Sequence, residues 1–498
     1  MTAFPMAERG PKKTADARVR WLFIVASLLV ILGAKIWSIA IYGSATPFWD
    51  QWDAEAAGLY PPYLAGTLRL SDLAAPHNEH RILLTRLFAL VVFVGSGRWD
   101  PILQMLYNAV VHTAATGLLL AMLSRIFDRA GTALLAFFCA IAFAVPYGWG
   151  NSLSAFQTQF YLLVLLGPLA LFLLYDATAW SARWWLGTLV ALVGYFSIAS
   201  GALTLPAFIG LAVIQLILGV RAGRNEWLGV GLHVLFAAAL IYDVPRIPEH
   251  AELRAQSALD FIDALAAAAS WPITAPQWPL LSLGVGACLL YAPVLVITGR
   301  LLRRPAPLTD RHWLLFGFAC WIGLQLAAAA YGRGTGAMNT RYLDIYILGV
   351  VLNAACVIWL ALVGGGGLRA FAVLWLIAVM MGGSTTAFDE LMRGITWRRD
   401  TAARQTENLK RFIATGDASA LQNKPIFDIP YPLPEKLIAM ASDPAIRAIL
   451  PAHLRGELEV HTRRDTILRH GALLIPLGLA LFMIAGMASR ARTHPGGP

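Results

Sequence analysis

Charged residues are scarce in this sequence. They make up 14% of the 498 residues, whereas hydrophobic residues make up 58% and the mean hydropathy is +0.62. A soluble chain of this length needs far more charge to cover its surface. The composition therefore excludes a soluble globular protein and predicts a polytopic membrane protein.

Cysteine is rare, and several familiar motifs are missing. The four cysteines lie in separate apolar runs without metal-ligand spacing, at positions 139, 288, 320 and 356. They are expected to be reduced packing residues rather than a disulfide framework. No glycine-rich nucleotide-binding motif follows a predicted strand, and no cleavable signal peptide is evident. The net charge of +10 comes mainly from short loops, so it indicates membrane topology rather than a nucleic-acid partner.

Apolar runs near the length needed to cross a bilayer occur about twelve times along the chain. They lie at residues 21–42, 102–123, 131–146, 156–175, 184–200, 202–220, 227–243, 279–299, 312–331, 342–362, 369–386 and 471–488. The predicted fold class is therefore an all-α polytopic membrane protein with about twelve transmembrane helices. The runs are almost free of ionisable residues, and polar groups gather in the loops on one side.

The basic residues predict the orientation. When the N-terminal tail is placed in the cytoplasm, the arginines of the alternate short loops all fall on the cytoplasmic side. The expected location is the bacterial cytoplasmic (inner) membrane, with both termini cytoplasmic. The predicted organisation is a tail at 1–20, a membrane domain at 21–386, a periplasmic outer segment at 387–470, a last transmembrane helix at 471–488 and a tail at 489–498.

The first outer loop, residues 43–101, is predicted to hold two helices at the membrane interface. One runs from about Asp50 to Tyr60 and is stopped by Pro61 and Pro62. The other spans Glu79–Gly95, because its apolar run is too short to cross and contains an arginine. In the outer segment, short helices are predicted at 400–414, 433–442 and 444–449. That segment is too small for an independent core.

Three acids, Asp50, Asp53 and Glu55, lie between and beside Trp49 and Trp52, where the chain leaves the first span. In a helix Asp50 and Asp53 share one face, and tryptophans suit the headgroup region. Paired acids beside a membrane can orient a sugar, hold a metal or remove a proton from a hydroxyl. The alternative is an N-cap and solvated acids on a surface helix.

Polar groups in the other outer loops complete a candidate site. His77, Glu79, His80 and Arg81 follow in the same loop, and their spacing would permit a divalent metal without matching a defined zinc motif. The alternative for this group is capping and interfacial hydrogen bonding of the next helix.

Amides and arginines come from two later loops. Gln157 and Gln159 lie among aromatic residues, a combination suited to sugar hydroxyls and sugar faces, unless they only provide polarity at a helix end. Arg333 and Arg341 flank a glycine-rich turn just before Tyr342 and suit a phosphate, because guanidinium binds phosphate oxygens in a fork. Anchoring to lipid headgroups is the alternative for these arginines.

The order of these motifs resembles the C-type integral-membrane glycosyltransferase superfamily, and within it the protein mannosyltransferase and aminoarabinose transferase group. The likeness covers about the first 130 residues in order of motifs and the rest in general architecture. Residues 50–55 occupy the position of the family's acidic pair, 75–81 that of its second turn and 97–101 that of its third. The chain lacks the family's adjacent Asp-Glu pair and its Lys-Pro-Pro turn, which leaves open which acid is the base.

The resemblance implies a mechanism and its partners. A polyprenyl-phosphate sugar donor would place its phosphate near Arg333 and Arg341, among membrane lipids. Asp53 or Asp50 would accept the proton of an acceptor hydroxyl on a glycan, lipid or protein, in a single inverting displacement on the periplasmic face. No cofactor is implied with certainty. Two alternatives stay open: a transporter of a lipid-linked saccharide and a non-catalytic membrane assembly subunit.

Overall fold

The computed structural model describes residues 13–457 and 462–490. Its regular elements in these residues are helices, apart from one two-stranded antiparallel hairpin of β1 (Pro76–His77) and β2 (His80–Arg81). The all-α fold class is therefore confirmed. The predicted tails fall largely on residues 1–12 and 491–498, which lie outside the described residues.

The long helices form one bundle, and each predicted span lies on one of them. They are α1 (Lys13–Tyr42), α5 (Pro101–Leu123), α6 (Arg129–Ala144), α8 (Thr158–Leu174), α9 (Ala182–Tyr195), α10 (Thr204–Ile217), α11 (Arg224–Asp243), α13 (Leu280–Arg303), α14 (His312–Arg333), α15 (Thr340–Val363), α16 (Gly366–Asp389) and α21 (Leu474–Arg490). By length and composition, nine helices in the described part of the chain could cross a membrane. Two of the nine, α10 and α21, reach this length together with the helical turns that precede them, as Ala199–Ile217 and Arg463–Ser489. α6, α8 and α9, with 16, 17 and 14 residues, are shorter.

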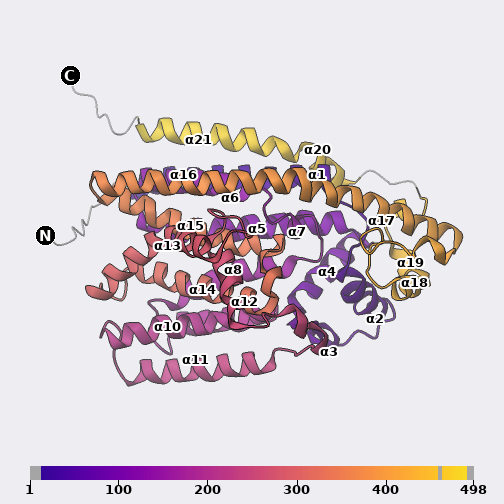
Figure 1. Ribbon diagram of the computed structural model, residues 1–498, viewed down its shortest axis with the longest axis horizontal. Coiled ribbons are helices and arrows are strands. Elements are labelled where there is room, and N and C mark those ends of the chain that lie inside the picture. Colours follow the sequence, from indigo (N-terminus) through magenta and orange to yellow (C-terminus); the bar gives the residue numbers. More distant parts are fainter. Residues whose placement is uncertain (1–12, 458–461, 491–498) are drawn as a thin grey trace.

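The bundle helices run side by side, and the remaining elements gather at one end of them (Figure 1). α1 packs against α5, α6 and α21. Its contact with α21 depends on small residues, because a side chain at Gly478 would collide with the α1 backbone at Ala26 and Val30. Such close approach is typical of helix pairs in membranes. α15 is the most deeply buried candidate span and contacts α6, α13, α14 and α16.

The elements at that end form what we call the extramembrane part, residues 43–100 and 390–457. After a π-helical turn (Trp52–Ala57) it contains α2 (Tyr60–Leu64), α3 (Leu70–Ala74), the hairpin, α4 (Leu83–Ser96), α17 (Thr396–Thr415), α18 (Pro434–Ser442) and α19 (Pro444–Ile449). Trp52, Tyr60 and Trp99 share one apolar core with Leu409 and Leu437. The outer segment therefore has its core in common with the first loop.

Three smaller helical elements connect the bundle near this end. They are α7 (Trp149–Ser152), α12 (Ala258–Ser270) and α20 (Arg463–His470). α7 contacts α5 and α15, and α20 contacts α1. α7 therefore lies against the beginning of α15, a position that bears on the site described below.

Two details of the first outer loop differ from the sequence prediction. Pro61 and Pro62 begin α2 instead of stopping a helix, because proline has a helical φ and lacks only an N–H that the first turn leaves unpaired. The prediction that a helix begins at Glu79 is also wrong. Glu79 lies in the turn of the hairpin, and the helix begins at Leu83.

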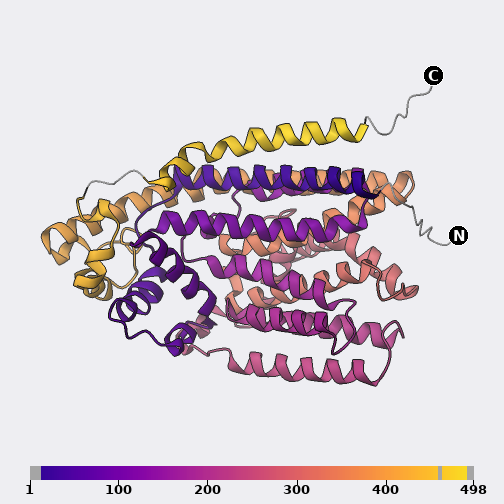
Figure 2. The same cartoon turned by 180° about the vertical axis from the view of Figure 1, so that it is seen from behind.

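α16 continues through a π-helical stretch (Glu390–Ile395) into α17, which gives one uninterrupted helix over residues 366–415. At 1.5 Å per residue such a helix is about 75 Å long, and it carries the chain from the bundle into the extramembrane part (Figure 1). Seen from behind, the start of α1 and the end of α21 lie together at the opposite end of the bundle (Figure 2).

Candidate active site

The acidic segment after α1 is held by backbone and side-chain contacts to the extramembrane part. Trp49 has φ +48° although it is not glycine, which is a strained conformation, and its N–H donates to the Pro430 carbonyl at 2.7 Å. The Gln51 side chain turns inward and donates to Gln104 Oε1 at 2.8 Å. These contacts leave the neighbouring Asp50 on the partly exposed side of the segment.

Asp50 lies beside His77, with His77 Nε2 3.8 Å from Asp50 Oδ1 and 31% of the Asp50 side chain exposed. Burial tends to raise the pKa of this carboxyl. The electrostatic interactions with His77, 3.8 Å away, and with Arg341 outweigh that effect, so the pKa of Asp50 is lowered from its ordinary value. Asp50 is therefore an ionised carboxylate at neutral pH.

Asp53 occupies a different environment. Its Oδ2 accepts a hydrogen bond from the Tyr431 hydroxyl at 2.7 Å. Tyr431 belongs to the outer segment, which was not assigned any site residue from the sequence. The hydrogen bond therefore ties the acidic segment to a part of the chain almost 400 positions away.

Glu55 is enclosed in the core of the extramembrane part and is 2% exposed. Its carboxylate accepts hydrogen bonds from Trp99 Nε1 at 2.6 Å, Gln51 Nε2 at 3.1 Å, the Tyr60 hydroxyl at 3.2 Å and Gln104 Nε2 at 3.3 Å. Burial nevertheless dominates and raises the pKa of Glu55 to about 7. The structure separates this acid from Asp50, although the sequence places both in one motif.

Glu79, His250 and Arg333 form a second group, which we call the Glu79 cluster. Arg333 Nη1 and Nη2 donate to the two Glu79 oxygens, each at 3.3 Å, and His250 Nδ1 lies 2.7 Å from Oε1. Burial would raise the pKa of Glu79, but the hydrogen bond and charge of Arg333 lower it to about 2. Arg333 is thus neutralised by a carboxylate.

The hairpin carries two further predicted residues, His80 and Arg81, to different neighbours. His80 Nδ1 accepts from the Ala199 N–H at 3.4 Å, and burial lowers the pKa of His80 to about 4. Arg81 forms a bidentate pair with Asp243 at the end of α11, at 2.6 and 2.8 Å. That pair fastens the hairpin to the bundle and occupies the Arg81 guanidinium.

The predicted amides are buried next to the hairpin. Gln159 Nε2 donates to Gln157 Oε1 at 2.9 Å, and both side chains are less than 10% exposed. Phe156, just before them, packs its ring edge-to-face on His77 with the centroids 5.3 Å apart. The amides therefore bond to each other, whereas Phe156 reaches the Asp50 side.

Arg341 lies in the first turn of α15 and has no carboxylate within ion-pair distance among the described residues. Its Nε donates to Asn339 Oδ1 at 3.3 Å, and its carbonyl accepts from Asn151 Nδ2 at 2.7 Å. Its charge nevertheless reaches Asp50. Tyr342 beside it packs edge-to-face on Phe160 at 5.8 Å.

The structure therefore brings part of the predicted site together. We call Asp50, His77, Phe156 and Arg341 the Asp50 cluster. Its members come from two loops and the first turn of α15, and they combine an ionised acid, an imidazole, an aromatic ring and a guanidinium that has no carboxylate partner among the described residues. In the residues described, no group of three His, Cys, Asp or Glu side chains could hold a metal ion.

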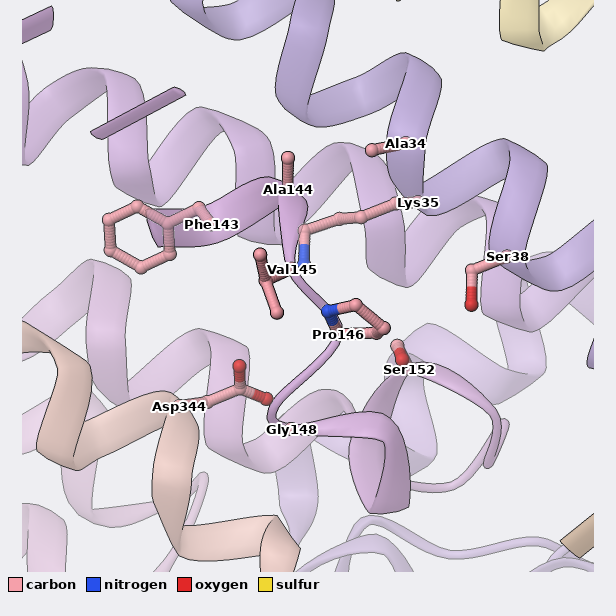
Figure 3. Close-up of a pocket in the computed structure, with 10 residues that line it drawn as sticks. All are labelled: Ala34, Lys35, Ser38, Phe143, Ala144, Val145, Pro146, Gly148, Ser152 and Asp344. Carbon is pink, nitrogen blue, oxygen red and sulfur yellow. The ribbon is translucent and has the colours of Figure 1, made fainter. Parts of the chain in front are cut away.

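Two ionisable residues inside the spans were missed by the sequence analysis. Lys35 on α1 and Asp344 on α15 are buried, and both line a small cavity next to α7 (Figure 3). The expectation that the spans are almost free of such residues overlooked this pair. A lysine inside the first apolar run was the available signal, because a charge at that depth needs a partner.

The comparisons with known proteins give one similarity. No family model and no curated protein matches the chain. Among solved structures, the chain is similar to the archaeal oligosaccharyltransferase AglB from Archaeoglobus fulgidus, in complex with an inhibitory peptide and a dolichol-phosphate. The TM-score is 0.48 and the identity 12%, over 81% of this chain and 60% of that one. The chain thus spans about three fifths of the length of that oligosaccharyltransferase.

Proposed function

We propose that this protein is a membrane glycosyltransferase that moves a sugar from a polyprenyl-phosphate donor to an acceptor hydroxyl. The observation that carries the proposal is the Asp50 cluster, in which an ionised carboxylate lies 3.8 Å from His77 and interacts electrostatically with Arg341, a guanidinium without a carboxylate partner among the described residues. The order of motifs resembling C-type glycosyltransferases supports the same reaction. We place this end of the bundle on the periplasmic face of a bacterial inner membrane, as the basic loops predict.

Asp50 is the proposed base. Its carboxylate accepts the proton of the acceptor hydroxyl while the hydroxyl oxygen forms a bond to the anomeric carbon. The bond between that carbon and the donor phosphate oxygen breaks, and the electron pair leaves with the polyprenyl phosphate. A single displacement of this kind inverts the anomeric configuration. His77, at 3.8 Å, orients the Asp50 carboxylate.

Arg341 is the proposed phosphate ligand. Negative charge grows on the phosphate as the bond breaks, and a guanidinium stabilises that charge in a site of low dielectric. Arg333 is less suited, because Glu79 already occupies it. Tyr342, next to Arg341 in the first turn of α15 and partly exposed, supplies an aromatic surface for the sugar or the first isoprene units. Phe156 is buried and supports the His77 ring from behind.

The polyprenyl tail of the donor does not lie in the apolar groove between α6, α15 and α16 in this proposal. That groove is lined on α15 by Ile347 and Val350. At 100° per residue these positions lie about 120° and 180° around the helix from Arg341. A lipid whose phosphate contacts Arg341 therefore approaches α15 from another side.

A transporter is favoured by one observation, the buried Lys35 and Asp344 in the spans. Transporters place such residues near the bilayer midplane, in broken helices. Here both residues lie within about 10 Å of the helix ends that face the extramembrane part, and α1 and α15 are unbroken there. A reaction at the membrane surface accounts better for this placement than transport across the membrane.

Transfer from polyprenyl-phosphate sugars by the purified full chain in nanodiscs tests the proposal. Asp50→Asn should lower the rate about 10³-fold, as expected for loss of a general base. Asp53→Asn should lower it about 10-fold, because Asp53 contributes one hydrogen bond to the position of the segment. Glu435→Gln, an exposed carboxylate on α18, is the matched control and should leave the rate unchanged. A rate in Asp50→Asn equal to wild type overturns Asp50 as the base, and a larger loss in Asp53→Asn assigns the role to Asp53.

A further inference from the structure

Lys35 and Asp344 form a buried pair of oppositely charged residue types from α1 and α15, which lie about 300 positions apart in the sequence. They are 9% and 7% exposed. Figure 3 shows the Lys35 amine and the Asp344 carboxylate pointing toward each other from α1 and α15 across a cavity. They make no direct ion pair within 4 Å in the part of the chain that the structure describes, yet their charges interact.

The cavity between them has a polar lining. Ser38 and Ser152 border it, and their hydroxyls are buried without a hydrogen-bond partner in the described residues. Gly148 completes the wall, because a side chain there would collide with the Asp344 carboxylate. The cavity volume of about 10 Å³ is near the minimum for one water molecule. Such a water would have two to four polar partners here.

A short chain of hydrogen bonds leads from this pair to Arg341. Asn151 Nδ2 donates to Asp344 Oδ2 at 2.8 Å and to the Arg341 carbonyl at 2.7 Å. One amide group of α7 therefore holds the buried carboxylate and the first turn of α15 at the same time. Any change that moves or neutralises Asp344 alters the hold on the Arg341 backbone.

We infer that the cavity binds one water that bridges Lys35 and Asp344, and that Lys35 is a positioning residue for Arg341. An isolated charge in an apolar bundle is costly, so each member of the pair depends on the other. Lys35 and the bridging water hold the Asp344 carboxyl group where it accepts the hydrogen bond from Asn151, and Asn151 fixes the turn that presents the Arg341 side chain. The inference rests on the proposed function only for the identity of the ligand that Arg341 contacts.

Other polar groups near the pair do not replace this link. His112 on α5 interacts electrostatically with Lys35, and Tyr161 on α8 with Asp344. The two rings stack on each other with centroids 4.4 Å apart. Neither forms a hydrogen bond to Asn151 or Arg341 among the described residues, so the path through Asp344 is the direct one.

The first measurement needs no ligand. Hydrogen–deuterium exchange of the full chain in nanodiscs should show about 10-fold faster exchange in residues 148–152 and 340–345 for Lys35→Met than for wild type. Ser27→Ala removes another buried hydroxyl of α1 away from the cavity and serves as the control. If both segments exchange in Lys35→Met as they do in wild type, Lys35 does not position this turn.

A second measurement uses undecaprenyl phosphate as the probe. Arg341→Ala should weaken its binding about 100-fold and Lys35→Met about 10-fold, while the double variant should bind no more weakly than Arg341→Ala alone, because both changes act on one contact. Losses that multiply would show that Lys35 acts through general stability and would overturn the inference. If Lys35→Met does not fold, Asn151→Ala breaks the same chain of hydrogen bonds and should give the same result. If wild type binds no probe, the proposed function fails, and the exchange measurement still decides on Lys35.

Discussion

Arg333 and Arg341 stand on either side of one short loop, but their surroundings differ. Arg333 is held by both oxygens of Glu79, with His250 completing the Glu79 cluster. Arg341 has only Asn339 as a side-chain partner among the described residues, and its charge acts on Asp50 without forming an ion pair. The two arginines look equivalent in the sequence and are not equivalent in the structure.

The two arginines therefore have different roles: Arg333 stabilises the fold, and Arg341 is available to bind a ligand. A guanidinium whose donors already meet a carboxylate contributes to the fold, and a ligand must displace that carboxylate to reach it. A guanidinium that keeps its donors free can bind a phosphate without such a cost. The Glu79 cluster therefore joins the hairpin to the end of α14, whereas the Asp50 cluster is left to interact with substrate.

The most direct way to break this comparison is to remove each arginine in turn. Arg341→Ala should lower kcat/KM for sugar transfer about 10²–10³-fold, as for other transition-state donors, with little change in thermal stability. Arg333→Ala should instead lower the free energy of unfolding by about 2 kcal/mol, because it leaves the buried Glu79 carboxylate without its guanidinium partner. Transfer rates and thermal unfolding of both variants provide the measurement.

The matched control restores neutrality in the Glu79 cluster. Arg333→Met combined with Glu79→Gln removes both charges and should be closer to wild type in stability than Arg333→Ala. If Arg333→Ala instead abolishes transfer while Arg341→Ala leaves it intact, the roles assigned to the two arginines are reversed.

Local patterns predicted much of the fold. The helices expected at 400–414, 433–442 and 444–449 correspond to α17, α18 and α19. Pro434 and Pro444 are the first residues of α18 and α19, and proline at the start of a helix is a signal that can be read from the sequence. The same residue type misled in the first loop, where Pro61 and Pro62 begin a helix. The length of the apolar runs predicted the helices of the bundle, but it does not decide whether the shorter helices α6, α8 and α9 cross the membrane.

The candidate site was predictable only as a set of residue types. Sequence spacing put Asp50, Asp53 and Glu55 together, but burial, which depends on the distant outer segment, separates them. No local signal pairs Glu79 with Arg333, Arg81 with Asp243 or Asp53 with Tyr431, since each pair is more than 150 positions apart. Such contacts follow from packing and not from periodicity.

Glu55 extends the comparison from arginines to acids. It is a buried carboxyl group whose hydrogen-bond partners are all neutral, whereas Glu79 is paired with Arg333. Its pKa is about 7 in the folded protein against an ordinary value of 4.5, which corresponds to about 3 kcal/mol. A raised pKa favours the protonated form in the folded state, so this contribution to stability is complete below pH 4.5 and is lost as the pH rises to about 7. Stability should therefore fall over that window.

Thermal unfolding of the purified chain between pH 4.5 and 8 measures this effect. Glu55→Gln should flatten the fall, since glutamine does not titrate, and Glu435→Gln should keep it. Parallel curves for wild type and Glu55→Gln would mean that another group causes the pH dependence and that Glu55 is better compensated than its neighbours indicate.

The smallest expected effect concerns Arg81, an arginine of the first outer loop that is paired with Asp243. Its side chain and that of Asp243 are 25% and 45% exposed, so solvent screens the pair and Arg81→Ala should cost less than about 1 kcal/mol of stability. Sugar transfer should stay within about threefold of wild type, because the guanidinium is already held by Asp243. Asp243→Asn breaks the same pair from the other side and should give the same result. A loss of transfer in Arg81→Ala as large as in Arg341→Ala, without a matching loss in Asp243→Asn, would place Arg81 on the substrate and end the distinction between held and available arginines.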